Sequence, residues 1–219
     1  MRILVALDQS PYAATVLEKA LALVKQQGAA MTIMTVAEDF MDIGDYMDTE
    51  KVTDKLLADA KAKAAQYVET AKAQGVPAEV ILDQGTSPAD LIIEQAGKGN
   101  FDLIVMGRPS SDPRGPHMST FEAALFESGR PVLLAPPKAS ATVGRHVLIA
   151  WNCSTEQARA TASAMPFLAR AERVTILTVE GAVVPGPSAE QLAGNLARHG
   201  IKATLINTQG GDNRTAGPT

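Results

Sequence analysis

The sequence contains one pattern of segments twice, and this repeat restricts the fold more than any other feature of the chain. Three segments of the first half recur in the same order in the second half. They pair as ILVALDQS (3–10) with VLIAWNCS (147–154), TIMTV (32–36) with TILTV (175–179), and GVPAEVILDQG (75–85) with GIKATLINTQG (200–210). Three collinear matches indicate a duplication, so the chain is predicted to contain two copies of one structural unit.

The first copy alternates short apolar segments with longer helical patterns. The apolar segments are predicted strands, and they read RILVAL, MTIMTV, AEVIL, DLIVMG and PVLLAPP. Two Ser-Pro pairs, Ser10-Pro11 and Ser87-Pro88, have the composition of a helix N-cap followed by proline at the first helical position. This alternation is typical of βαβ units, which form parallel sheets. We therefore predict a complete five-stranded α/β domain with strand order 3-2-1-4-5.

The second copy is shorter than the first. Nine residues follow Gly210, whereas the first copy continues for about fifty residues after Gly85. We assign residues 1–137 to a complete domain, 138–145 to a linker and 146–219 to a partial, three-stranded copy. In that copy the apolar strand HVLIAW (146–151) lacks a neighbour on one side. An uncovered edge strand promotes aggregation, so either the chain is a truncated product or another surface pairs there.

The composition is that of a soluble globular protein. Of 219 residues, 46% are hydrophobic and 20% are charged, and the net charge is −4. This balance gives no reason to expect nucleic-acid or membrane binding, and 4% aromatic residues are too few for a base-stacking platform. The single cysteine excludes an internal disulfide, and no run approaches the ~20 apolar residues of a membrane span. We expect a cytoplasmic protein.

Several segments together resemble a universal stress protein domain. They are ILVALDQSPYA, GVPAEVILDQGTSPADLI, FDLIVMGR and SGRPVLLAPP, and HVLIAWNCSTEQARA resembles the start of a second domain in tandem members of the family. The resemblance implies a flavodoxin-like (Rossmann-like) fold, a role in survival under stress, and pairing of domains through the fifth strand. Because this chain has one such strand, we expect a homodimer through residues 131–137.

The resemblance also implies a candidate nucleotide site. Some members of the family bind ATP through an aspartate after strand 1, the end of strand 2, and a glycine loop after strand 4. The matching positions in this sequence are Asp8, Val36, Gly107, Ser110, Ser119 and Thr120. Arg108, directly after the first glycine, is added as a candidate because its cation could meet phosphate. The loop pattern has three glycines, of which only Gly107 is retained, and Ser110 stands at the second. The candidate ligand is therefore ATP or another adenine nucleotide, with Mg²⁺.

Three prolines weaken this loop, MGRPSSDPRGPHMST (106–120), as a phosphate site. Phosphate is held by converging backbone N–H groups, and proline supplies none. The loss of two charge-assisted hydrogen bonds would cost about 3 kcal/mol of triphosphate affinity. The cations Arg108 and Arg114 could offset part of this loss. The sequence predicts a degenerate nucleotide site.

Two of these positions also have interpretations that need no ligand. Ser119 and Glu122 have the S-x-x-E spacing of a capping box, which predicts that the fourth helix begins at Ser119. Asp8 is either a ligand contact at the switch point of the sheet or a hydrogen-bond partner for the turn at Gln9-Ser10. The three histidines share no metal-ligand spacing, so no metal site is predicted.

No catalytic constellation is evident in the sequence. We find no nucleophile–base pair, no paired catalytic carboxylates and no P-loop motif. We therefore expect a non-enzymatic binding or signalling module in the stress response. The alternative is an ATP-binding universal stress protein with weak nucleotide hydrolase activity. A phosphoacceptor switch built on Asp8, Asp83 and Lys138 would require a second acid after strand 1, which ALDQS lacks.

Overall fold

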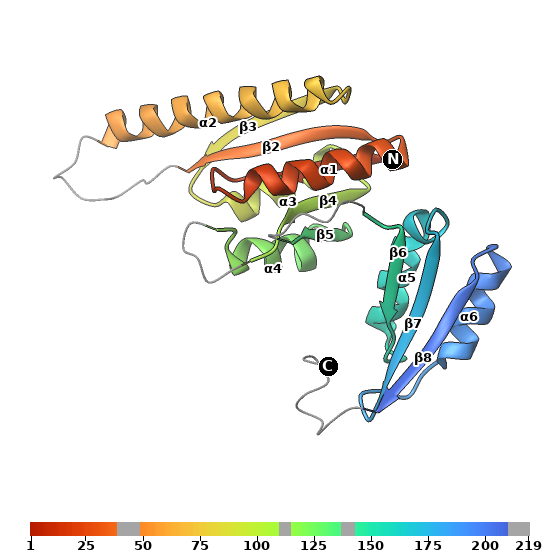
Figure 1. Cartoon of the computed structure of the whole chain (residues 1–219). Helices are drawn as coiled ribbons and strands as arrows, with labels where there is room; N and C mark the ends of the chain where they lie inside the picture. Colours follow the sequence, from red (N-terminus) through yellow and green to blue (C-terminus); the bar gives the residue numbers. More distant parts are fainter. Residues whose placement is uncertain (39–48, 110–114, 137–142, 210–219) are drawn as a thin grey trace. The chain divides into compact units, whose positions relative to one another are not determined.

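A computed structural model describes residues 1–38, 49–109, 115–136 and 143–209 (Figure 1). The chain divides into two compact units, Met1–Ala141 and Thr142–Thr219.

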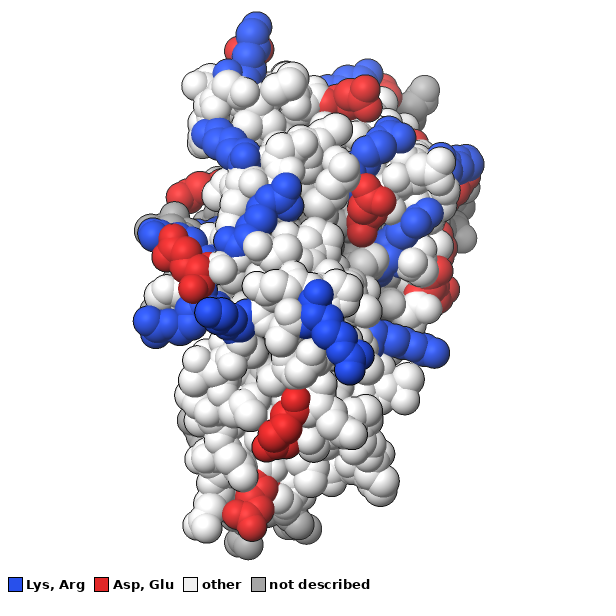
Figure 2. Space-filling view, turned by 90° about the vertical axis from the view of Figure 1, so that its right-hand side faces the viewer, with Lys and Arg blue, Asp and Glu red and all other residues white. Residues whose placement is uncertain are grey.

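Among the described helices, none is both long and apolar enough to cross a membrane. On the face drawn in Figure 2, basic and acidic side chains are interspersed and separated by uncharged areas.

The sheet of the first unit has the predicted strands and order. Its five strands are parallel and lie in the order β3-β2-β1-β4-β5. Their bounds are β1 Arg2–Ala6, β2 Ala30–Glu38, β3 Ala78–Gly85, β4 Leu103–Gly107 and β5 Val132–Ala135. The predicted flavodoxin-like fold is confirmed. The order reverses between β1 and β4, which leaves a crevice at the carboxyl ends of these strands.

Four helices cover the two faces of this sheet. They are α1 (Ala13–Gln27), α2 (Thr49–Ala73), α3 (Pro88–Lys98) and α4 (Met118–Glu127). Helices α1 and α2 contact each other, as do α3 and α4. Leu4 of β1 packs in a core with residues of α3 and α4. Its neighbours Ile3 and Val5 point to the opposite face and are also fully buried, so β1 is covered on both sides.

One of the two predicted Ser-Pro helix starts is confirmed. The Ser87 hydroxyl accepts a hydrogen bond from the Asp90 N–H, and α3 begins at Pro88. The start predicted at Ser10-Pro11 is wrong, because α1 begins only at Ala13 and has no side-chain cap. The Ser10 hydroxyl instead donates to Asp8 and accepts from the Tyr12 N–H. Local hydrogen bonds of this kind compete with capping.

The capping box predicted at Ser119 and Glu122 is also wrong. Helix α4 begins one residue before Ser119, and its N-cap is His117, which makes no side-chain capping bond. His117 has extended backbone (ψ 144°) and its carbonyl accepts from the Phe121 N–H. An N-cap residue has non-helical backbone, whereas Ser119 already lies within the helix.

The second unit contains a three-stranded parallel sheet, with the number of strands that the repeat predicted. Strands β6 (His146–Ala150), β7 (Arg173–Glu180) and β8 (Ala203–Gln209) are parallel and ordered β6-β7-β8. Helices α5 (Thr155–Leu168) and α6 (Ala189–Arg198) connect them. The core contains Ile149, Trp151, Leu168, Ile176, Leu192 and Leu196.

The other face of this smaller sheet is uncovered in the described structure. Leu148 of β6 is 57% exposed and Ile206 of β8 is 46% exposed. Leu4 occupies the matching position in the first unit and is fully buried, because β4 pairs beside it and α3 and α4 lie above it. The described part of the second unit contains no counterpart of β4, α3 or α4, so the exposed edge predicted for residues 146–151 is present.

Candidate functional site

A cavity lies at the carboxyl ends of β1, β2 and β4, at the point where the strand order reverses. Its volume is about 460 Å³. All four helices of the first unit or their preceding turns contribute to it. The lining residues are Ala6, Leu7, Asp8, Gln9, Ser10, Pro11, Ala13, Val16, Met34, Val36, Leu56, Pro88, Ile92, Met106, Gly107, Gly115, Pro116, His117 and Thr120. Open α/β sheets bind ligands at this place.

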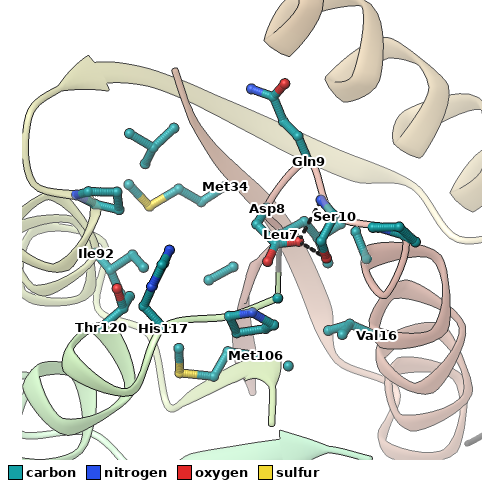
Figure 3. A pocket seen from close by; sticks show the side chains of 18 of the residues that line it. Leu7, Asp8, Gln9, Ser10, Val16, Met34, Ile92, Met106, His117 and Thr120 are labelled. Atoms are coloured by element: carbon teal, nitrogen blue, oxygen red, sulfur yellow. Dashed lines mark hydrogen bonds between the residues drawn. The ribbon is translucent and has the colours of Figure 1, made fainter. Parts of the chain in front are cut away.

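The walls of the cavity are mostly apolar. Figure 3 shows Ile92, His117 and Thr120 on one side and Ser10 and Val16 on the other, with Asp8 between them. Among the lining residues that the structure describes, Asp8 is the one acidic residue, and no lysine or arginine is present. The site therefore combines apolar surface with a few polar groups, as small-molecule pockets do.

Asp8 lines the cavity and also holds the turn that follows β1. Its Oδ1 accepts hydrogen bonds from the Ser10 N–H at 3.0 Å and from the Ser10 hydroxyl at 2.5 Å. The interpretation of Asp8 as a hydrogen-bond partner of the turn is thus confirmed. Because Asp8 also lines the cavity, the interpretation as a ligand contact remains compatible with the structure. In the second unit Asn152 Oδ1 accepts the same bond from the Ser154 N–H at 3.0 Å. The turn needs an oxygen acceptor there, not a negative charge.

Sequence reasoning missed Tyr67, which supports Asp8 from helix α2. The Tyr67 hydroxyl donates to the Asp8 carbonyl oxygen at 3.0 Å, and the side chain is 6% exposed. Burial, followed by the negative charge of Asp8, raises the pKa of Tyr67 to about 12. The sequence signal was the buried stripe of α2, which passes through Ala64, Tyr67 and Ala71.

Gly107 lies directly under the ring of Pro116. A Cβ built on Gly107 would lie 2.7 Å from Pro116 Cγ and 3.3 Å from Val16 Cγ2. Glycine is required here because the two segments approach closely. The space that a phosphate cradle would leave open above this glycine is therefore occupied by the chain itself.

The remaining predicted site residues separate into three groups. Val36 and Thr120 line the cavity together with Asp8 and Gly107. Arg108 and Ser119 are exposed and do not line it. The Arg108 N–H donates to the Ala135 carbonyl at 3.0 Å. Ser110 lies outside the described residues, as do Pro113 and Arg114.

In the second unit, residues 181–187 cover the end of β6. The Trp151 indole N–H donates to the Pro187 carbonyl and the Val184 N–H donates to the Asn152 carbonyl, both at 2.9 Å. A Cβ on Gly186 would lie 2.0 Å from the Cys153 carbonyl oxygen. The turn that matches the Asp8 turn is thus packed against a loop of its own unit.

The described residues contain no cluster of three or more side chains that would hold a metal ion. Asp83, at the end of β3, accepts a hydrogen bond from the Gln95 side chain at 2.9 Å. The Asp8 carboxylate accepts its hydrogen bonds from Ser10, so Asp8 and Asp83 have different hydrogen-bond partners.

Residues 1–136 match the family model of the universal stress protein family. No protein of curated function matches the chain. Three solved structures are similar to it. A universal stress protein from Archaeoglobus fulgidus is 21% identical, with a TM-score of 0.70 over 96% of this chain and 79% of that one.

Universal stress protein UspA from Lactobacillus plantarum is 20% identical, with a TM-score of 0.54 over 62% of this chain and 97% of that one. A family member from Burkholderia pseudomallei is 26% identical, with a TM-score of 0.51 over 61% of this chain and 93% of that one. The structural likeness concerns the fold, and the family follows from the match over residues 1–136, more than half of the sequence. The chain belongs to the universal stress protein family.

Proposed function

We propose that this chain is a non-catalytic binding module of the stress response that holds an adenine nucleotide in the cavity of the first unit. One observation carries the proposal: four of the positions that match the family's nucleotide site line a single cavity. They are Asp8, Val36, Gly107 and Thr120. These residues come from the turn after β1 and from β2, β4 and α4, so the fold gathers them from distant parts of the sequence.

The cavity has the size and chemistry for such a ligand. A volume of about 460 Å³ falls within the usual range of small-ligand pockets. Met34, Val36 and Ile92 supply apolar surface for the faces of a base. Asp8 and Thr120 supply polar atoms for its edge or for ribose hydroxyls.

The same lining supports a binding role in preference to hydrolysis. Metal-assisted phosphoryl transfer requires groups that hold the metal beside the phosphates. Among the described lining residues Asp8 is the one carboxylate, and one of its oxygens already accepts two hydrogen bonds from Ser10. Incubation with labelled ATP and Mg²⁺ separates the two activities: retention without turnover supports a binding module, and turnover supports the hydrolase alternative.

A pair of neighbouring substitutions tests where the ligand binds. Thr120→Trp places a bulky side chain in the cavity and is expected to abolish AMP binding in calorimetry. Ser119→Trp adds the same side chain one residue earlier, at an exposed position outside the lining, and should leave binding unchanged. Equal affinity of the two variants would contradict the assignment of this cavity.

We also propose that the chain forms a homodimer through β5. This strand lies at the edge of the five-stranded sheet, so one side of its backbone has no strand beside it in the described structure. The isologous pairing of two identical edge strands would satisfy those backbone groups. Native mass spectrometry of freshly purified protein would report both the subunit number and any co-purified nucleotide.

A further inference from the structure

Strand β6 lies at one edge of its sheet (Figure 1) and directs a row of backbone groups away from β7. The Trp151 N–H donates to the Leu177 carbonyl of β7 at 2.7 Å. Because backbone N–H and C=O groups alternate between the two sides of a strand, His146, Leu148 and Ala150 direct theirs to the other side. No strand pairs with β6 on that side in the described structure. We call it the open side of β6.

In the first unit, β4 fills the matching side of β1. The Leu7 N–H makes the same bond there, to the Met34 carbonyl of β2 at 2.9 Å, and on its other side β1 pairs Leu4 with Ile104 of β4. All five residues of β4 are buried. Leu148, at the position of Leu4, is 57% exposed. The first unit thus shows which segment fits beside such a strand: a parallel strand that is apolar on both faces.

The repeat also places helix α5 over the open side of β6. Its counterpart α1 contacts β4 and β5 as well as β1, and Val16 of α1 lies against Gly107 at the end of β4. Val16 is 4% exposed, whereas Ala160, the matching residue of α5, is exposed. A second copy of β6 would bring its own α5 to the same space. A lone extended segment, without a helix on this face, fits there instead.

The amino end of β6 favours an acidic residue at the start of that segment. In the first unit Asp102 directly precedes β4, and its Oδ2 accepts from the Arg2 N–H at 2.7 Å. His146 occupies the position of Arg2 and directs its N–H to the open side of β6. An acid placed like Asp102 would therefore find the same donor in the second unit.

The charges around this end of β6 favour the same choice. Arg145 and Arg173 are both exposed there. One acid, Glu172, lies between them in the sequence, and it accepts from Arg145 Nε at 2.6 Å. The two arginines and the one glutamate leave a net positive charge, which attracts a carboxylate.

We propose that the open side of β6 binds an extended segment of a partner polypeptide as a parallel strand, the segment being an acidic residue followed by four apolar residues. Main-chain hydrogen bonds supply affinity in such strand addition, and alternate side chains supply specificity. One set of apolar side chains would lie under α5 and the other beside Leu148. The proposed nucleotide cavity belongs to the first unit and takes no part in this interaction.

A peptide with the chain's own β4 segment, NFDLIVMGR (residues 100–108), serves as the probe. In fluorescence anisotropy, the full chain is expected to bind the labelled peptide saturably, with one peptide per chain. The peptide variant Asp102→Lys should bind about tenfold more weakly, because it replaces a charge-assisted hydrogen bond with repulsion. The absence of saturable binding would overturn the proposal, and equal binding of the two peptides would overturn the role of the acid.

Backbone methylation of the peptide tests the direction of pairing. The Ile104 N–H points away from β1, to the Pro131 carbonyl of β5, so by alternation the Val105 N–H points to β1. If the peptide binds β6 as β4 binds β1, N-methylation at Val105 should weaken binding about tenfold or more, because it removes a donor and adds bulk at the interface. N-methylation at Ile104 should have a much smaller effect. Equal effects at the two positions would contradict parallel pairing.

Two substitutions in the protein locate the binding site. Leu148→Lys removes an apolar contact at the open side and should weaken peptide binding about tenfold. Ile206→Lys introduces the same residue on β8, at a position that is 46% exposed but separated from β6 by β7, and should leave affinity within about twofold. Equal affinity of the two variants would overturn the assignment to β6. An oligomer that dissociates with Leu148→Lys and is not displaced by the peptide would assign the edge to a second copy instead.

Discussion

Asp8 and Asn152 occupy matching positions in the two units and accept the same hydrogen bond, from the N–H two residues later. The same turn is thus formed with a carboxylate in the first unit and with an amide in the second. Both side chains present an oxygen in the same place, which is what a turn of this type requires. Only Asp8 adds a negative charge, and this charge faces the cavity of the first unit.

This comparison predicts how substitutions of Asp8 affect stability. Asp8→Asn is expected to change the free energy of unfolding by less than about 0.5 kcal/mol, because the acceptor remains. Asp8→Ala removes the acceptor and should lower it by about 1 kcal/mol. Urea denaturation followed by circular dichroism measures both, and equal losses in the two variants would show that the charge itself stabilises the turn.

Tyr67 predicts a dependence of stability on alkaline pH. In the unfolded chain a tyrosine loses its proton near pH 10, whereas the folded state holds the Tyr67 proton up to a pKa of about 12. The stabilisation is complete below pH 10 and is lost as pH rises from 10 to 12. Tyr67→Phe should therefore be less stable than wild type at pH 8, by about 1 kcal/mol for the lost hydrogen bond. The difference in the free energy of unfolding between wild type and Tyr67→Phe should narrow as the pH rises towards 12.

Urea denaturation of both proteins across this pH range tests the prediction. A stability difference that stays constant from pH 8 to pH 12 would contradict it. Absorbance at 295 nm provides an independent measurement, since one of the three tyrosines should ionise about two pH units above its ordinary value.

At the scale of elements, β6 differs from β1 in what covers it. Leu148 and Ile149 are adjacent but point to opposite faces of the sheet. Leu148 is 57% exposed and Ile149 is 8% exposed. The uncovered face therefore has few packing contacts to lose, while the covered face carries the core of the unit.

This difference predicts opposite outcomes for one substitution at two neighbouring positions. Leu148→Lys should leave the free energy of unfolding within about 0.5 kcal/mol of wild type. It should also reduce aggregation, because a lysine on an edge strand opposes further pairing. Ile149→Lys buries a charge and should cost about 3 kcal/mol or more. Thermal denaturation and light scattering measure the two effects, and comparable destabilisation would show that the Leu148 face is covered in solution.

At the scale of the whole molecule, the proposed dimer depends on the outer backbone of β5. The Pro131 carbonyl accepts from Ile104 of β4 and the Ala135 carbonyl accepts from Arg108, directly after β4. By alternation, Leu134 therefore directs its N–H to the open edge. Leu134→Pro removes that N–H and should convert the dimer to a monomer in sedimentation. Leu134→Ala shortens the side chain but keeps the N–H, and should remain dimeric. A monomeric wild-type protein at tens of micromolar would contradict the dimer.

The strands and their order followed from the sequence alone, whereas the candidate site rested on the resemblance to the family. Alternating apolar and helical patterns specify parallel strands locally, and the ends of such strands gather at one edge of the sheet. Ser87 was identified as a cap because its role involves residues only three positions away. The repeat likewise predicted the bare edge of β6, since it showed which elements the second copy lacks.

The tertiary structure decided the features that depend on contacts between distant segments. Tyr67 meets Asp8 across 59 residues, and Pro116 packs on Gly107 because a returning loop crosses the end of β4. The start of α1 also differs from the prediction, because Asp8 engages the hydroxyl of Ser10 that would have capped it. Local patterns determined which elements form, whereas competition for hydrogen bonds and space, settled only in the folded chain, determined the shape of the site.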